Sequence, residues 1–305
     1  MMSRRAMNKV MLSAAFLLAL AGPRLAIAAD PKPKVVATFT IIGDLVEAVG
    51  GDAVTVTTLV GPDGDAHVFE PKPSDVAAVA HANLIVANGL GMEPWLERLT
   101  EAADFQGKTV VASDAVTPLP FKEEADSSGQ MPDDPHAFQD LSNGRLYVKT
   151  IAAALEALAP AEAGAIADRA SKLDAEMAAL DQEIKTKLAA LPAANRRILT
   201  SHDAFHYFGK AYGLDILSIQ GVSTETEPSP ADLAALARQA RDGKVKAIFL
   251  ENMSNPTLAQ TISSETNVPV GGELVADALT APGGFAPHYL DMFKYNLAEL
   301  LKVLR

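Results

Sequence analysis

Cysteine is absent from the 305 residues of this sequence, so neither a disulfide bond nor a thiolate metal ligand can form. Long apolar runs are absent beyond the N-terminal segment, which predicts no membrane-spanning helix in the rest of the chain. Positive charge is scarce: 26 Lys and Arg stand against 38 Asp and Glu, and the formal net charge is −12. Such an acidic chain is not expected to bind nucleic acid, because contacts to phosphates require Lys and Arg.

The N-terminal segment has the composition of an export signal. Basic residues up to Lys9 precede an apolar run at 10–21, which is too short to cross a bilayer of about 30 Å as a helix. We therefore expect a signal peptide over residues 1–28, cleaved near Ala28/Ala29, and a periplasmic protein of a double-membraned bacterium. An uncleaved membrane anchor is the alternative. No cysteine follows the signal, so we expect no lipid anchor.

β-branched runs alternate with helix-like stretches in both halves of the chain. Strands are expected at 34–40, 54–60, 83–89, 109–113, 196–201, 215–221, 246–252 and 268–274. Helical patterns occupy 41–49, 74–80, 94–103, 143–158, 203–212, 230–242, 256–266 and 287–303. This alternation is typical of parallel sheets with helices on their faces. We predict an α/β fold with two lobes, each containing a mostly parallel four-stranded sheet flanked by helices.

One long helix is predicted between the two halves. Residues 161–191 are rich in Ala, Leu, Glu and Lys, lack Gly and Pro after Gly164, and carry apolar residues at helical spacing. A helix of this length would reach about 45 Å, so we expect it to link two lobes, residues 29–160 and residues 192–305. Residues 118–135 have no periodicity and predict a flexible loop.

Four polar side chains, two from each half, follow expected strands: His67, His136, His202 and Asp277. Ligands bind beyond the carboxyl ends of parallel strands, so the four can meet only if the two lobes face each other across a cleft. Three imidazoles and one carboxylate suit a borderline divalent metal such as Zn²⁺. Four protein ligands leave no open position for a catalytic water, which favours transport over catalysis.

Five segments follow one another along the chain: GPDGDAHVFEPKPSD, DPHAFQDLSNGRLYVKTIAAAL, SHDAFHYFGKAYGL, GVSTETEPSPADL and GGELVADALT. Together they resemble the metal-specific (zinc/manganese) periplasmic solute-binding proteins of ABC importers, cluster A-I, zinc type. The resemblance covers essentially the whole mature chain and implies two α/β lobes joined by a long helix. It implies metal ligands at His67, His136, His202 and Asp277, no enzymatic activity, and delivery of the metal to a membrane permease.

Two features depart from the family pattern. Residues 139–141 read Gln-Asp-Leu where many members have an acidic Asp-Pro, and the loop 118–135 lacks the histidines that many zinc members carry there. The resemblance implies that manganese-type members often replace the third His with Glu. His202 therefore favours one Zn²⁺ per chain, with manganese or iron as the alternative.

The resemblance also leads to expectations about partners and about the order of steps in metal binding. We expect a monomer that docks on the permease of an ABC importer, with a periplasmic metallochaperone as a further candidate partner. The loop 118–135 is expected to be ordered by metal and to bring His136 to it last. Affinity is expected to fall below about pH 6.5, because imidazoles must be neutral to bind.

Other functions, and other roles for the residues near these ligands, are also compatible with the sequence. HDAFH places His206 four residues after His202, like the helical His pair of a metalloprotease, so a metal-dependent hydrolase is one alternative. A surface adhesin on the same scaffold is another. If His202 ends a strand instead, His206 serves packing or supports a ligand. Asp65, Glu70 and Glu227 are candidates for orienting or bonding ligands, whereas structural or surface roles are expected for His81, His288, Trp95 and Phe205.

Overall fold

The β-branched and aliphatic runs form two parallel sheets, one in each half of the chain. The computed structural model describes residues 32–121, 132–221, 224, 229–253 and 256–305. The strand order is β2-β1-β3-β4 in the first sheet and β6-β5-β7-β8 in the second, with every pairing parallel. The strands are β1 (Lys34–Phe39), β2 (Thr55–Val60), β3 (Leu84–Ala87), β4 (Lys108–Val111), β5 (Arg197–Thr200), β6 (Asp215–Ser218), β7 (Ile248–Glu251) and β8 (Val270–Leu274).

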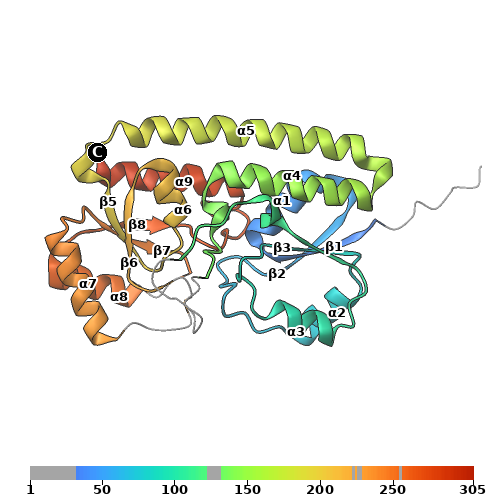
Figure 1. The fold of residues 1–305 in the computed structure, drawn as a ribbon, viewed down its shortest axis with the longest axis horizontal. Helices are drawn as coiled ribbons and strands as arrows, with labels where there is room; N and C mark the ends of the chain where they lie inside the picture. Colours follow the sequence, from blue (N-terminus) through green and yellow to red (C-terminus); the bar gives the residue numbers. More distant parts are fainter. Residues whose placement is uncertain (1–31, 122–131, 222–223, 225–228, 254–255) are drawn as a thin grey trace, which may run out of the picture. The chain divides into compact units, whose positions relative to one another are not determined.

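Helices flank each sheet, as the predicted fold class requires (Figure 1). The α-helices are α1 (Thr40–Gly50), α2 (Pro73–Ala80), α3 (Leu96–Ala102), α4 (Leu141–Leu158), α5 (Ala163–Ala189), α6 (His206–Tyr212), α7 (Pro230–Asp242), α8 (Pro256–Thr266) and α9 (Tyr289–Leu304). The α/β fold with two parallel four-stranded sheets is therefore confirmed. Among the described residues no single helix is long and apolar enough to span a membrane, although α4 taken together with 160–189 passes that test across a 119° bend.

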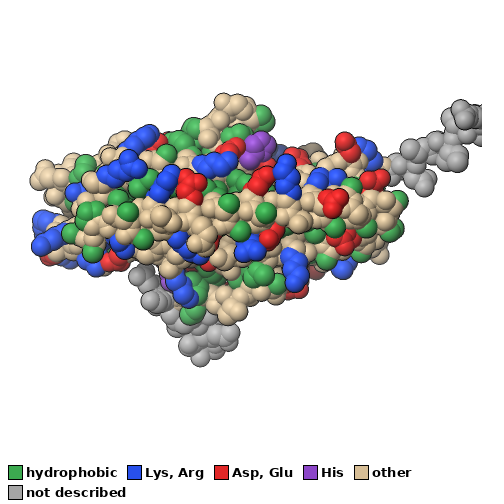
Figure 2. All heavy atoms as spheres, turned by 90° about the horizontal axis from the view of Figure 1, so that it is seen from above, with side chains coloured by type: hydrophobic (Ala, Val, Ile, Leu, Met, Phe, Trp, Pro, Cys, Tyr) green, Lys and Arg blue, Asp and Glu red, His purple; other side chains and the backbone are tan. Residues whose placement is uncertain are grey.

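The long helix α5 lies along both halves and packs against α1, α4, α6 and α9 (Figure 1). It contains 27 residues and is therefore about 40 Å long. Its buried side turns Ile166, Met177, Ile184 and Leu188 inward. Its outer side carries interspersed positive and negative side chains (Figure 2). The predicted linking helix is thus present, with its ends two residues inside the predicted bounds.

A single apolar cluster runs through both halves of the chain. It joins β1, α1 and α4 of the first half to α5, α6 and α9. A smaller cluster, which includes Leu199, Ile248 and Ile262, fills the space between the second sheet and α7 and α8. Residues 32–305 accordingly form one compact unit. The division into lobes at residues 160 and 191 stays a prediction.

The stretch predicted as a flexible loop, 118–135, is paired at both of its described ends. The main-chain N–H of Phe121 donates to the carbonyl of Pro132 at 2.8 Å, and the N–H of Asp134 donates to the carbonyl of Leu119 at 2.9 Å. These bonds hold the chain just before His136 in a defined position. The centre of the stretch, 122–131, and the predicted signal peptide lie outside the described residues.

Truncation of Ile184 in α5 is expected to destabilise the protein as a whole. Its side chain is fully buried in the cluster shared by both halves, so Ile184→Ala leaves a cavity and should cost about 2–5 kcal/mol of unfolding free energy. Urea unfolding of the metal-free protein measures this loss. The exposed neighbour Lys187→Ala, which removes a surface ion pair with Glu183, is the control and should change stability by less than about 0.5 kcal/mol.

Candidate metal centre

The structure brings together the four side chains that the sequence singles out: His67, His136, His202 and Asp277. One ligating atom from each lies within 4.8 Å of the others, and all four side chains are buried. His67 follows β2, His202 follows β5 and Asp277 follows β8. His136 comes directly after the segment 118–135, whose described ends are hydrogen-bonded to each other. The carboxyl ends of both sheets therefore meet at this four-residue cluster.

Four separations within the four-residue cluster are close to those of ligands around one small cation. Nε2 of His67 lies 3.3 Å from Nε2 of His136, and Nε2 of His202 lies 2.9 Å from Oδ2 of Asp277. The same Oδ2 is 3.5 Å from Nε2 of both His67 and His136. Ligand atoms around a tetrahedral ion with bonds of about 2.0–2.1 Å are about 3.3–3.4 Å apart. The other oxygen of Asp277 is buried without a hydrogen-bond partner among the described residues, which a cation would stabilise.

Two buried carboxylates bind the outward nitrogens of the imidazoles. Nδ1 of His136 lies 2.9 Å from Oδ1 of Asp134, and Nδ1 of His202 contacts Glu251. Glu251 also accepts a 3.0 Å hydrogen bond from the main-chain N–H of His202. A carboxylate on Nδ1 fixes the tautomer that leaves Nε2 free to bind an ion. The imidazoles of His136 and His202 are thus oriented by the protein itself.

The loop that carries His67 is fixed from both halves of the chain. Asp65 accepts a 2.8 Å hydrogen bond from the main-chain N–H of His67, and its other oxygen accepts one from Thr224. The indole N–H of Trp95 donates to the carbonyl of Ala66 at 2.7 Å. Asp65 therefore orients the loop, and Trp95 is both a core residue and a support for it.

The segment around Asp277 is tied to the first half of the chain. Gln139, which departs from the family pattern, is fully buried and donates a 2.6 Å hydrogen bond to the carbonyl of Ala276. The main-chain N–H of Leu279 donates to Thr40 at 2.8 Å. Asp140 accepts from the N–H of Ser142 and so caps α4. The departure in sequence thus supplies a direct support for the fourth member of the cluster.

Mutual proximity shifts the pKa values of the buried groups. Burial alone would lower the pKa of His136, but the charges of Asp277 and Asp134 outweigh it and raise the pKa to about 9. Burial is likewise outweighed at His202, where Glu251 and Asp277 raise the pKa well above the ordinary imidazole value. The same pairs lower the pKa of Asp134 to about 2 and that of Asp277 well below its usual range, against the effect of burial.

Comparison with known proteins identifies the family. Residues 35–303 match the family ZnuA, described as zinc-uptake complex component A, periplasmic. The chain belongs to this family. It is therefore a metal-binding, substrate-binding component of an ABC importer and not an enzyme. Membership of the ZnuA family implies a membrane permease and ATPase as partners.

Two relatives in sequence are named for manganese. The manganese ABC transporter substrate-binding lipoprotein PsaA of Streptococcus mitis is 32% identical over 298 residues, 96% of each chain. The manganese-binding lipoprotein MntA of Halalkalibacterium halodurans is 32% identical over 264 residues, 87% of this chain and 86% of that protein. Both names include the word lipoprotein, so the absence of a lipid anchor here stays a prediction.

Solved structures of the family share the fold. The periplasmic zinc binding protein TroA from Treponema pallidum superposes with a TM-score of 0.84 at 29% identity, over 90% of this chain and 99% of TroA. A manganese-bound periplasmic metal binding protein from Candidatus Liberibacter asiaticus gives a TM-score of 0.80 at 28% identity, over 90% of this chain and 100% of that protein. The family is thus clear, whereas the names of its members point to both metals.

The hydrolase alternative is wrong, because HDAFH is not a helical pair. His202 lies in the turn after β5, and His206 is the first residue of α6, with its Nδ1 near Asp134. The other sequence candidates lie away from the four-residue cluster: Glu70 and His81 are exposed, and exposed His288 pairs with Asp44. Phe205 is buried in the core, and Glu227 lies outside the described residues.

Sequence reasoning missed Asp134 and Glu251, the two carboxylates that orient imidazoles. Glu251 ends a strand whose other residues are apolar, and a lone acid at the carboxyl end of a buried strand is a usable signal. Asp134 stands two residues before His136, a spacing at which an aspartate can turn back onto its neighbour. The signal at Glu251 becomes decisive only with the pairing of β5 with β7.

Metal binding is expected to release protons and to strengthen as the pH rises from 6 towards 9. The raised pKa values of His136 and His202 favour protons on both imidazoles at neutral pH, and we expect a metal to displace them. Affinity should therefore rise about tenfold per pH unit for each displaced proton. As the pH is lowered, metal affinity should therefore begin to fall nearer pH 9 than pH 6.5, the value expected for an ordinary imidazole. Calorimetry in buffers of different ionisation enthalpy measures the release; affinity that is flat over this range would contradict it.

Proposed function

We propose that this protein binds one Zn²⁺ per chain with high affinity and delivers it to the permease of an ABC importer. One observation carries the proposal: three imidazole nitrogens and one carboxylate oxygen lie within 4.8 Å of one another, and four of their separations, 2.9–3.5 Å, are close to the edge length of a tetrahedron. Imidazole suits zinc, and four protein ligands fill its preferred shell. In this proposal His67, His136, His202 and Asp277 are the ligands.

Manganese is the second candidate, and the names of the two sequence relatives favour it. A site for manganese is better served by carboxylate, carbonyl and water oxygens than by three imidazoles. Divalent zinc also exceeds manganese in affinity for a given nitrogen and oxygen site. The donor set of this chain therefore supports zinc, while manganese would bind as a weaker competitor.

The position of the ligands suggests how the cargo is held and released. The proposed ligands come from both halves of the chain, and they are buried, so a bound ion has little contact with solvent. Release then requires the segments around His67 and His136 to separate from those around His202 and Asp277. We propose that docking on the permease drives this separation. A monomeric state and a periplasmic metallochaperone stay predictions.

Metal analysis tests the choice of ion. The purified protein is stripped with chelator, offered equal amounts of Zn²⁺ and Mn²⁺, desalted and analysed by mass spectrometry. We expect one Zn²⁺ per chain and almost no manganese, because zinc has the higher affinity for this donor set. Retention of manganese in the presence of equal zinc would overturn the choice of zinc and leave the importer function standing.

Substitution of His136 tests the ligand set. His136→Ala removes one of four proposed ligands and is expected to raise the Kd for Zn²⁺ by at least about 100-fold, since one lost metal bond exceeds the effect of losing an outer partner. The exposed His81→Ala is the matched control and should bind zinc as the native chain does. Chelator competition gives both constants, and an unchanged Kd for His136→Ala would remove His136 from the site.

A further inference from the structure

The start of α6 contacts the segment that carries His136, although the two belong to different halves of the chain. Nδ1 of His206 lies 3.4 Å from Oδ2 of Asp134. The hydroxyl of the next residue, Tyr207, donates a 3.1 Å hydrogen bond to the main-chain oxygen of Asp134 and accepts one from the N–H of Leu119. Two successive residues of α6 therefore hold both the side chain and the main chain of one aspartate.

The two carboxylate oxygens of Asp134 have different surroundings. Oδ1 accepts hydrogen bonds of 2.9 Å from both Nδ1 and the main-chain N–H of His136. Oδ2 is buried and makes no hydrogen bond of regular geometry within the described residues. A buried carboxylate oxygen without a donor is costly, and the imidazole of His206 at ion-pair distance is placed to stabilise it.

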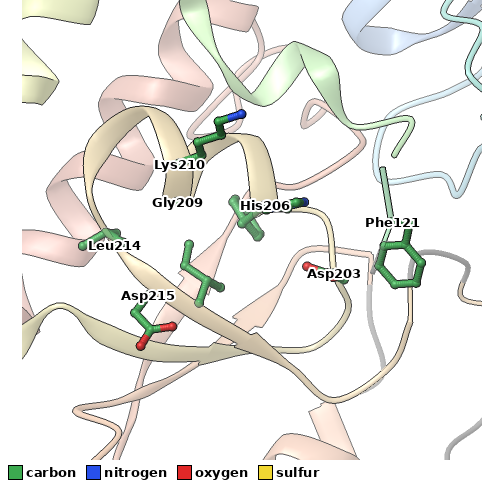
Figure 3. A pocket seen from close by; sticks show the side chains of 9 residues that line it. Phe121, Asp203, His206, Gly209, Lys210, Leu214 and Asp215 are labelled. Carbon is green, nitrogen blue, oxygen red and sulfur yellow. The ribbon is translucent and has the colours of Figure 1, made fainter. Parts of the chain in front are cut away.

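His206 is not a member of the four-residue cluster and lies between that cluster and solvent. Its side chain is 27% exposed. It lines a surface pocket of ≈ 350 Å³, alongside Asp203 and Lys210 (Figure 3). A continuous series of contacts thus leads from this pocket through His206 and Asp134 to His136.

We propose that His206 is a positioning residue for the metal centre, which acts through Asp134 to hold Nε2 of His136 towards the ion. Without a partner for Oδ2, the carboxylate of Asp134 is free to rotate away, and the His136 ring then loses the acceptor that fixes its orientation. Because α6 belongs to the second half, this support exists only while the two halves are together. The inference rests on the proposed function, since it assumes that His136 binds the metal.

Two substitutions at His206 separate positioning from packing. His206→Leu fills similar space without a donor, whereas the amide nitrogen of His206→Asn can occupy the place of Nδ1. With Zn²⁺ as the probe, we expect His206→Leu to raise the Kd and the dissociation rate about tenfold, the lower end of the range for outer partners of metal-binding histidines. The His206→Asn variant should restore most of the lost affinity. His288→Leu, which removes an exposed imidazole paired with Asp44, should change neither value.

A double-mutant cycle tests the route through Asp134. Asp134→Asn alone should weaken zinc binding about 10- to 100-fold. If His206 acts through Asp134, adding His206→Leu to Asp134→Asn costs little more; full addition of the two losses would overturn the proposal. Thermal unfolding of each metal-free variant verifies that it folds, and His206→Ala replaces His206→Leu in the cycle if the leucine variant does not.

The same assay distinguishes this inference from the proposed function. His136→Ala with native zinc affinity would overturn both, because His136 would not be a ligand. Loss of zinc in His136→Ala together with native affinity and dissociation rate in His206→Leu would overturn the positioning role alone. Weak binding by both His206→Leu and His206→Asn would also overturn it, since the donor at Nδ1 would then not be what matters.

Discussion

The buried carboxylate of Asp277 is the group on which the rest of the centre depends. A carboxylate with no solvent exposure is costly unless opposite charge and hydrogen bonds compensate for lost hydration. Here its Oδ2 lies 2.9 to 3.5 Å from Nε2 of three imidazoles that come from three separate segments. His202 reaches this oxygen from the same sheet, whereas His67 and His136 reach it only because the carboxyl ends of both sheets face each other.

The hydrogen bonds that support the four-residue cluster also run between the two halves of the chain. Gln139 of the first half holds the carbonyl beside Asp277, and Asn252 of the second half donates to Asp63 in the loop of His67 at 2.8 Å. The helix α5 and the shared apolar cluster provide the continuous frame behind them. Any movement that separates the halves therefore disturbs several ligands at once, which suits a carrier that must hold its cargo tightly and then release it.

Local patterns in the sequence predict those features of the fold that depend on residues close together in the chain. The bounds of α7 and α8 match their predicted ranges, because proline at the first helical position marks the start of each. Convergence of His202 and Asp277 follows from the rule that strand ends form sites. Glu251 could not be assigned to His202 from the sequence, because the two are 49 residues apart and only the pairing of β5 with β7 brings them together. The contact of His206 with Asp134 depends likewise on how the halves pack.

The charges of the centre explain how one buried site tolerates both the metal-free and the metal-bound condition. In the metal-free protein, the raised pKa values of His136 and His202 favour protons on both imidazoles, which offset two of the negative charges of Asp134, Glu251 and Asp277. A divalent cation that displaces one proton from each imidazole brings two positive charges and removes two. The total charge of the site is then the same before and after metal binding, so binding buries no additional net charge. A monovalent cation that displaced both protons would lower this total by one charge, so the arrangement favours a divalent ion.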